Sequence, residues 1–344
     1  MPDFEDVKRS LSQATRFILI AEMRGAAPCC IACFVEATLP SNFAIGRRHI
    51  GSIPTRQLYL LGETVLGELR PETWSLLLAE LNRFTPYEFI NLGEISTASD
   101  LYRAVTSSPA RYRVSCWSGE GNVRWLINLP QTFEDYVVSL RSKSRQMVRQ
   151  SLRKYNGAGS FEVVSRENQV DEFLSVASQI NRKTYQWRLG LRIWNDHETQ
   201  AEYSRLARLG QLRCYVLRID GEPCAFIRGI LVGDIYLYQA TGYLPEHRKW
   251  SPGKIILMLA IKDLIEAGDC RIFDFGDVGD HVGYKSRFGN VFLPSRRILV
   301  SQRFSFRPTL IASAQAFLLA LKNISKRIFT TAELRRRVRQ LLRT

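Results

Sequence analysis

The 344-residue sequence has no apolar run long enough to cross a bilayer. Its longest uncharged apolar stretch is "PTLIASAQAFLLAL" at 308–321, which falls short of the roughly 20 residues that a transmembrane helix needs. The N-terminus "MPDFEDVKRS" is acidic, and no apolar segment follows it, which argues against a secretory signal. We therefore expect a cytoplasmic protein.

Residues that commonly bind metals are also scarce. The chain has four His and seven Cys, and an odd number of cysteines without an export signal argues against a disulfide framework. Cys29, Cys30 and Cys33 cluster in "PCCIACF", but no fourth Cys or His lies near and the flanks are apolar. We expect these thiols to be small buried hydrophobic groups and we expect no metal site.

Acidic residues are nearly absent from the C-terminal end. The net charge is +15, and residues 301–344 contain ten Lys or Arg but the single acid Glu333. There an apolar stretch leads into "LRRRVRQLLR", for which we expect a short basic amphipathic helix. A second basic run, "RSKSRQMVRQSLRK" at 141–154, carries six cations and no acid. Such segments fit an anionic membrane face or a nucleic acid, and a solvated, disordered end is the alternative for the tail.

Core-forming residues, by contrast, are plentiful, since 45% of the residues are hydrophobic and 11% aromatic. That suffices for two compact domains. The second half predicts helices at 132–157 (with Thr132 as N-cap), 169–186 and 197–209. Three strands follow, "LRCYVLRI", "PCAFIRGILV" and "IYLYQATGY", joined by tight turns at Asp220-Gly221 and Gly233-Asp234. A helix from an N-cap at Ser251 to Gly268 precedes the strand "RIFDF", a polar loop with a short helix, and a last strand near "RRILVSQ".

The first half repeats this plan in part. "QLYLLGE", a helix at about 72–83 and "EFINLGEI" parallel "DIYLYQA", the helix from Ser251 and "IFDFGDV". The closest match pairs 91–94 (Asn-Leu-Gly-Glu) with 274–277 (Asp-Phe-Gly-Asp). We expect two related domains, 1–130 and 131–302, followed by a basic helical tail at 303–344.

The element order, with a Ser-Pro-Gly loop before the crossover helix, resembles the GNAT acyltransferase fold. Five segments further resemble the GNAT branch associated with cellulose and polysaccharide biosynthesis (CelD-like), which is similar to the Fem-type aminoacyltransferases. They are "SLRSKSRQMVRQSLRK", "INRKTYQWR", "DGEPCAFIRG", "GYLPEHRKWSPGKIIL" and "FDFGDVGDHVGYKSRFGN", within about 135–292. The resemblance implies an α/β (α+β) fold with tandem GNAT-like domains, each a mixed, mainly antiparallel twisted sheet flanked by helices.

The resemblance places acyl-CoA at the start of the crossover helix, where 248–253 corresponds to the R/Q-x-x-G-x-G/A signature. Amides at a helix N-terminus and the nearby cations favour a diphosphate. Ser251 replaces the first glycine and Pro252 removes one amide, which weakens the signature. An ordinary N-cap with surface lysines is the alternative. The expected contacts to acetyl-CoA or another acyl-CoA are Arg248, Lys249, Ser251, Gly253, Lys254, Tyr238 and Gln239, the last two along the pantetheine arm.

The stretch "RIFDFGDVGDHVGYKSRFGN" is expected to carry the chemistry. In Fem-type enzymes the lysine of an FK-x-x-F element is implicated in acyl transfer, and 284–289 matches that pattern with Lys285. Acyl transfer also needs a base for the acceptor proton and a donor for the leaving group. We assign these roles to Asp274 or Asp277 and to Tyr284. Expected substrate-binding residues are Trp187, Arg287 and His281.

Each of these residues also has an ordinary structural interpretation. Lys285 and Arg287 can form the solvated face of a short helix or pair with Asp277 and Asp280. Asp274 can hydrogen-bond a neighbouring loop. His281 can be an exposed loop residue, and Trp187 can belong to the core.

The function expected from this resemblance is an acyl-CoA-dependent N- or O-acyltransferase that works by direct attack in a ternary complex. The acceptor would be a sugar, amino-sugar or amine in bacterial envelope or exopolysaccharide synthesis. The C-terminal basic helix would allow peripheral association with the inner membrane face. The alternatives are a Fem-like transferase that uses aminoacyl-tRNA and an inactive scaffold that docks on a membrane or nucleic acid. The first domain reads "LGELRPETW" where its phosphate loop would fall, and Glu68 and Glu72 would repel a diphosphate.

Overall fold

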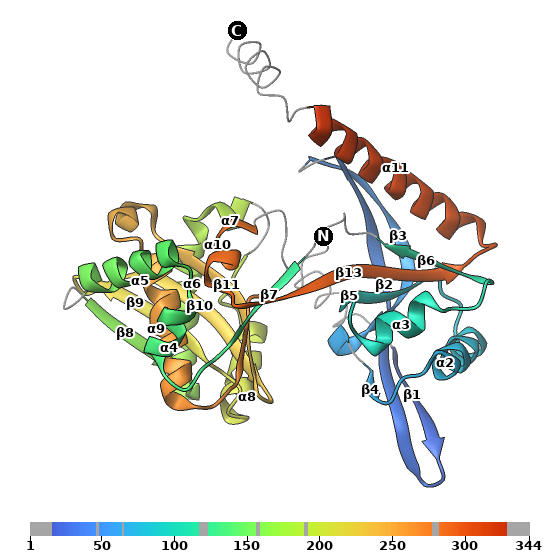
Figure 1. Ribbon diagram of the computed structural model, residues 1–344, viewed down its shortest axis with the longest axis horizontal. Coiled ribbons are helices and arrows are strands. Elements are labelled where there is room, and N and C mark those ends of the chain that lie inside the picture. Colours follow the sequence, from blue (N-terminus) through green and yellow to red (C-terminus); the bar gives the residue numbers. More distant parts are fainter. Residues whose placement is uncertain are drawn as a thin grey trace. The chain divides into compact units, whose positions relative to one another are not determined.

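The computed structural model describes residues 16–45, 48–63, 65–116, 123–155, 159–188, 192–276 and 282–328. The chain forms two compact units, one of Met1–Asn122 with Pro294–Thr344 and one of Val123–Leu293. In each unit, helices flank a twisted and mainly antiparallel set of strands (Figure 1).

The first unit is built on a long antiparallel meander followed by a crossover. Strands β1, β2 and β3 pair antiparallel, and β5 then runs parallel to β3 after the helix α2. Trp74, Leu78 and Leu81 of α2 are buried against this sheet. The elements are β1 Arg16–Arg24, β2 Ala27–Ile45, β3 Arg48–Leu60, η1 Leu61–Glu63, β4 Leu66–Gly67, α2 Pro71–Phe84, β5 Phe89–Ser96, α3 Asp100–Thr106 and β6 Tyr112–Cys116.

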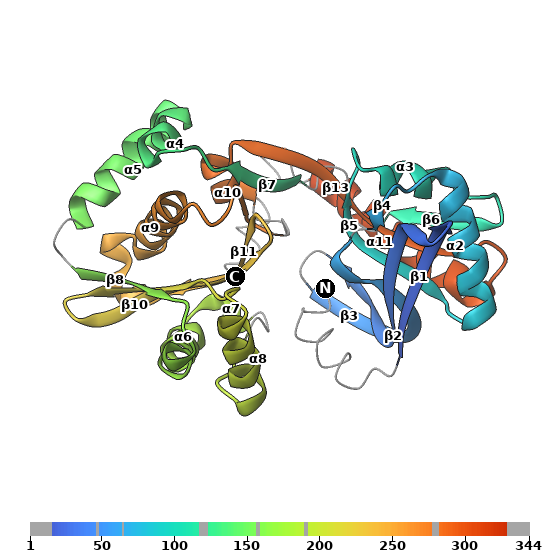
Figure 2. The same ribbon diagram turned by 90° about the horizontal axis from the view of Figure 1, so that it is seen from below.

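The second unit has the strand order β7-β12-β11-β10-β9-β8, in which β11 and β12 form the parallel pair. Helices α4, α5 and α9 lie on one side of this sheet and α6, α7 and α8 on the other (Figure 2). The elements are β7 Val123–Asn128, α4 Phe133–Ser139, α5 Ser142–Tyr155, β8 Gly159–Val164, η2 Glu167–Gln169, α6 Val170–Arg182, α7 Tyr185–Arg188, α8 His197–Arg208, β9 Cys214–Ile219, β10 Glu222–Val232, β11 Ile235–Tyr243, η3 Pro245–Trp250, α9 Pro252–Ala267, β12 Ile272–Asp274 and α10 Val282–Phe288.

Most local predictions for this unit are confirmed. The two hairpins form, and Asp220 and Gly221 have the positive φ values (53° and 80°) that a tight turn between twisted strands requires. Thr132 caps α4 by accepting the Asp135 amide. The single helix expected at 132–157 is wrong, because the chain becomes extended at Leu140 (ψ 151°) and restarts as α5.

The expected internal repeat extends to hydrogen bonds. In both units a strand, a crossover helix and a parallel strand follow one another, β3–α2–β5 and β11–α9–β12. Within β5, Asn91 Oδ1 accepts the Gly93 amide at 3.0 Å, and at the end of β12, Asp274 Oδ1 accepts the Gly276 amide at 2.8 Å. Both glycines are left-handed, with φ of 70° and 67°. The residues 91–93 and 274–276 therefore share the same local hydrogen bond and the same left-handed glycine.

Strands β7 and β13 each join a different unit from the one that the sequence predicts. Strand β7 follows the first unit in the chain but pairs antiparallel with β12. Strand β13 (Val291–Gln302) follows the second unit but pairs with β5 and β6. The unit boundaries at 122/123 and 293/294 therefore differ from the expected 130 and 302, because a strand belongs to the sheet whose backbone it pairs with.

The last described helix, α11 (Phe306–Ile328), packs against β2 within the first unit. No described helix is both long and apolar enough to span a membrane.

Candidate active site

The two parallel strands of the second unit part at their carboxyl ends. Their ladder covers Ile235–Leu237 and Ile272–Asp274. Strand β11 continues to Tyr243, whereas β12 stops. Just beyond the ladder the pairing of β11 with β10 skips Gln239, which is exposed. A bulge of this kind bends its strand and disrupts pairing locally, and this one lies beside the end of β12.

Asp274 closes the end of β12 and is buried, at 2% exposed. Its Oδ2 accepts from Nε of Arg124 at 2.8 Å and from Nη2 of the same side chain, while its Oδ1 accepts the Gly276 amide. Both carboxylate oxygens are thus engaged, which is the arrangement expected if Asp274 bonds the neighbouring loop. A general base must reach the proton that it removes, and Asp274 as base remains a prediction.

Lys285 lies where the sequence places the chemistry. It is half-buried on α10, and its Nζ donates to the carbonyl oxygen of Phe275 at 2.6 Å. Phe275 is the first residue after β12, so a cation is held at the point where the strands part. Lys285 is therefore not fully solvated, and the acids of its alternative pairing, Asp277 and Asp280, lie outside the described residues. Arg287 on the same helix is exposed.

Two aromatic contacts position α10. The Tyr136 hydroxyl donates to the buried carbonyl of Phe288 at 3.0 Å, and burial raises the pKa of Tyr136, so this hydroxyl stays a proton donor. The ring of Tyr284 meets Phe275 edge-on, with 6.4 Å between the centroids, and Tyr284 is 38% exposed. An exposed phenol next to Lys285 is compatible with the expected proton donation.

The structure does not place two of the expected site residues. Asp277 and His281 lie outside the described residues, so their assignments stay predictions. The sequence analysis missed Arg124, which precedes its partner Asp274 by 150 positions. No local motif signals that pair, because Arg124 and Asp274 meet only when β7 pairs with β12 in the folded sheet.

The start of α9 is less open to a diphosphate than the sequence suggests. Ser251 is the N-cap residue of α9, as expected, but its backbone is left-handed (φ 57°, ψ 50°) and its side chain makes no capping bond. Its amide donates to the Arg248 carbonyl, and its carbonyl accepts the Lys254 amide. Pro252 has no N–H. The amide of Gly253 is therefore the one at the helix start that takes no part in the bonds just named.

The neighbouring donor residues divide into cations and packing groups. Arg248 and Lys249 are exposed and Lys254 is half-buried, so three cations flank the Gly253 amide in sequence. A Cβ at Gly253 would lie 3.2 Å from the Tyr243 ring, which leaves little room for a side chain there. The ring of Tyr238 is 7% exposed and packs against Phe273 and Phe275, so this side chain belongs to the core.

Trp187 belongs to a cluster of aromatic and arginine side chains. It meets Trp194 edge-on at 5.5 Å, and the guanidinium groups of Arg192 and Arg182 lie 5.0 and 5.7 Å from its ring centroid. The preceding residue, Gln186, donates to the Thr241 carbonyl at 3.2 Å. Helix α7 is thereby fastened to β11 two residues beyond Gln239. Trp194, Arg192 and Arg182 are candidates that the sequence did not single out.

Helix α5 carries a basic groove of about 380 Å³. It is lined by Ser142, Arg145, Gln146, Arg149, Gln150 and Arg153. Arg149 pairs with Glu134 of α4, while Nε of Arg145 is buried without a hydrogen-bond partner among the described residues. Since α5 contacts both η3 and α9, the basic run at 141–154 adjoins the expected diphosphate loop.

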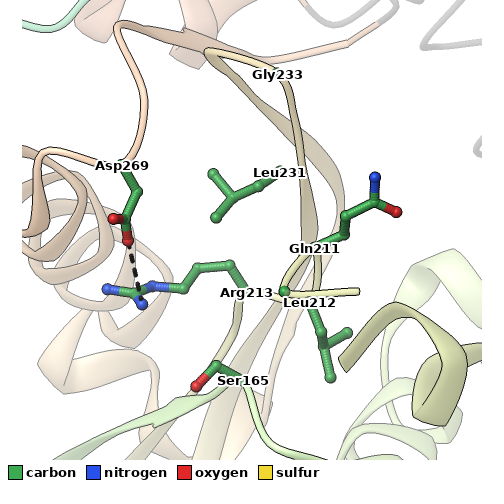
Figure 3. A pocket seen from close by; sticks show the side chains of 8 residues that line it. Ser165, Gln211, Leu212, Arg213, Leu231, Gly233 and Asp269 are labelled. Atoms are coloured by element: carbon green, nitrogen blue, oxygen red, sulfur yellow. Dashed lines mark ion pairs between the residues drawn. The ribbon is translucent and has the colours of Figure 1, made fainter. Parts of the chain in front are cut away.

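A larger cavity of about 460 Å³ lies elsewhere in the same unit (Figure 3). Arg213 and Asp269 point towards each other in it, with 3.7 Å between their charged atoms. Arg213 also pairs with Asp263 at 2.7 Å. The cavity adjoins the beginnings of β11 and β12, whereas the strands part at their ends, and none of the expected site residues lines it. Its charges neutralise one another, which favours a structural role.

The cysteines are free thiols of differing exposure. Cys30, Cys214, Cys224 and Cys270 are buried, and Cys116 is exposed. Within the described ranges, no three His, Cys, Asp or Glu side chains gather in a group that could hold a metal ion.

Comparison with known proteins agrees with this geometry. Residues 142–286 match the family described as acetyltransferase (GNAT) domain. The chain is similar in fold to FemX, with a TM-score of 0.61 at 10% identity over 88% of this chain and 92% of FemX. It is also similar to the C-terminal domain (DUF2156) of an Agrobacterium fabrum protein assigned as a lysylphosphatidylglycerol synthetase, with a TM-score of 0.50 at 16% identity over 92% and 96% of the two chains.

No curated protein sequence matches the chain. At these identities the solved structures show the fold alone, and the family match carries the chemistry. The second unit therefore contains a GNAT acetyltransferase domain, and the protein is a transferase of the acyltransferase class.

Proposed function

We propose, from the premise of a GNAT acetyltransferase domain at 142–286, that the second unit transfers an acyl group from acyl-CoA to an amine or hydroxyl. The observation that carries this proposal is the parting of β11 and β12 beside Lys285. The β11–β12 ladder ends at Leu237 and Asp274, and an extended substrate would bind beside that end.

The residues at this opening support direct attack in a ternary complex. An acceptor nitrogen or oxygen forms a bond to the thioester carbonyl carbon, the carbon–sulfur bond breaks, and the acceptor proton leaves to a base. The Lys285 ammonium, held by the Phe275 carbonyl, would stabilise the negative charge that develops on the carbonyl oxygen. The exposed hydroxyl of Tyr284 would return a proton to the thiolate. Asp277 is the sequence-based candidate for the base.

The acceptor would enter next to the cluster around Trp187. Aromatic faces and guanidinium groups bind sugar rings and anionic groups well, which supports a small-molecule or glycan acceptor such as a sugar or amino-sugar. The first unit would contribute structure and no chemistry, because Glu68 and Glu72 adjoin the start of α2 where its phosphate loop would fall.

A second donor, aminoacyl-tRNA, is favoured by the groove on α5. Arg145, Arg149 and Arg153 recur every fourth residue along that helix, next to the cations of η3. A basic track of this length suits successive phosphates of a nucleic acid better than one diphosphate. The start of α9 supports the same donor, because it offers a diphosphate only the Gly253 amide.

Titration calorimetry with acetyl-CoA and with aminoacylated tRNA tests both donors. For the first donor we expect acetyl-CoA to bind, and Gly253→Glu to weaken it at least about tenfold, because a carboxylate beside the diphosphate repels it. Ala267→Glu adds the same charge at the other end of α9 and should change little. The second donor would be assigned if the protein bound tRNA but not acetyl-CoA. That binding should depend steeply on salt, and the double variant Arg149→Gln/Arg153→Gln should weaken it and reduce its salt dependence. A folded protein that binds neither would contradict both and leave the inactive scaffold.

A further inference from the structure

Helix α11 presents an apolar stripe on its outward side. Phe306, Leu310, Phe317 and Leu321, which we call the outer stripe, are 82%, 58%, 63% and 38% exposed. Their spacing places them on one side of a helix that turns about 100° per residue. Phe304, just before the helix, is 90% exposed. Contiguous exposed apolar side chains of this size usually mark an interaction surface.

The opposite side of α11 is packed, so the stripe does not result from fraying. Pro308, Ile311, Ala312 and Gln315 are buried. Ile311 packs in a cluster with Phe89 and Leu299 of the first unit, and α11 lies along β2 (Figure 1). Arg307 pairs with Glu88 at 3.0 Å and donates to the Pro54 carbonyl at 2.9 Å. The helix is therefore held with the outer stripe facing away from its own sheet.

Cations occur at both ends of the outer stripe. At its start, Arg303 and Arg111 are exposed, and the Arg303 amide donates to the Arg111 carbonyl. At its end the sequence places Lys322, Lys326 and Arg327, and residues 301–332 contain no acid. The segment thus combines exposed aromatic and aliphatic side chains with cations and no acid in its sequence.

We propose that the outer stripe docks this protein on an anionic lipid bilayer, with α11 lying in the interfacial plane. Phenylalanine and leucine side chains enter the boundary between headgroups and acyl chains, and arginines and lysines at the ends of the stripe contact lipid phosphates. This surface differs from the basic helix expected at 334–343, which lies outside the described residues.

Charge disfavours the other occupants. A second copy seated on the same stripe would bring cations of α11 against cations, with no acid in that segment to pair them. A nucleic acid would contact the cations but would leave Leu310 and Leu321 without an apolar partner. A bilayer of anionic lipid satisfies both kinds of side chain.

Vesicle co-sedimentation of the full chain tests the proposal independently of either acyl donor. We expect binding to vesicles of phosphatidylcholine with about one third phosphatidylglycerol, and little to phosphatidylcholine alone. Phe306→Ser/Phe317→Ser should weaken binding by at least about tenfold, because each ring loses its apolar contact with the lipid. The matched control is Leu76→Ser/Phe84→Ser on α2, whose side chains are 62% and 57% exposed off the stripe. It should bind like the parent.

Several results would overturn this docking. One is that the parent chain does not bind vesicles at all. Another is that the stripe variant and the control variant lose binding equally. The third is a stripe variant that binds like the parent, which would place docking in the tail. Self-association in ultracentrifugation, or binding of an RNA oligonucleotide, that is lost in the stripe variant without any vesicle binding would assign the surface to those partners. Unchanged melting curves ensure that each variant is folded.

Discussion

Replacing Asp274 by asparagine tests whether its carboxylate anchors the end of β12 or acts as the general base. The side chain is 2% exposed, with one oxygen on the Gly276 amide and the other on Arg124. Asparagine keeps the size and the first bond, since Asn91 makes that same bond to Gly93 in the first unit. The ion pair with Arg124 is what the substitution removes.

The expected cost follows from the burial of this pair. Breaking a buried ion pair by removing one partner costs about 3–5 kcal/mol, but Arg124 is 30% exposed and can be partly hydrated. We therefore expect the free energy of unfolding to fall by about 2 kcal/mol, which lowers the melting temperature of a unit of this size by about 4–8 °C. Turnover should fall because loss of the Arg124 pair loosens β7 from the end of β12, and the Phe275 carbonyl that holds Lys285 bonds to β7 through the Phe275 amide, while the pH–rate profile keeps its acidic limb.

Calorimetry and a pH–rate profile measure both quantities. Glu94→Gln is the matched control, because Glu94 is a buried acid within β5 and pairs with Arg297 at 3.9 Å. It should destabilise the first unit and leave the shape of the pH–rate profile unchanged. An Asp274→Asn variant with unaltered melting temperature and no acidic limb would refute the anchoring role and restore Asp274 as the general base.

Two further predictions concern stability. Gly229→Ala should destabilise by about 1–3 kcal/mol, because its Cβ would lie 2.1 Å from the buried Tyr236 hydroxyl, whereas Gly51→Ala, with nothing within 4 Å, should be near neutral in urea denaturation. Burial raises the pKa of Cys270 from 9.0 to about 11 and that of Cys214 to about 12. The unfolded chain then loses these protons first, so stability is full below pH 9 and falls as the pH rises towards 11. A flat urea midpoint between pH 8.5 and 10.5 would contradict this assignment.

Much of the candidate site could be predicted because its signals are local. The crossover helix begins at the Ser-Pro-Gly segment, and Lys285 lies beside the end of the strand that "RIFDF" forms. The side-chain roles were less predictable. Ser251 is the N-cap residue that the sequence indicates, yet its backbone is left-handed and its side chain makes no capping bond. Tyr238 looks like a ligand contact in the sequence, yet its ring packs in the core. Backbone conformation decides the role of Ser251 and packing decides that of Tyr238. Neither leaves a periodic pattern in the sequence from which the role could be predicted.

The sequence by itself determined the elements whose signals lie within a few residues. These include the hairpin turn at Asp220-Gly221, the helix exit at Gly268, and the local hydrogen bond that 91–93 and 274–276 share. Only the tertiary structure decided which sheet each strand joins and which charges meet. Strand β7 joins the sheet of the second unit and β13 that of the first, and Arg124 reaches Asp274 across 150 positions. The physical reason is that turns and caps satisfy backbone groups locally, whereas a sheet edge or a buried carboxylate accepts whichever partner the whole fold brings to it.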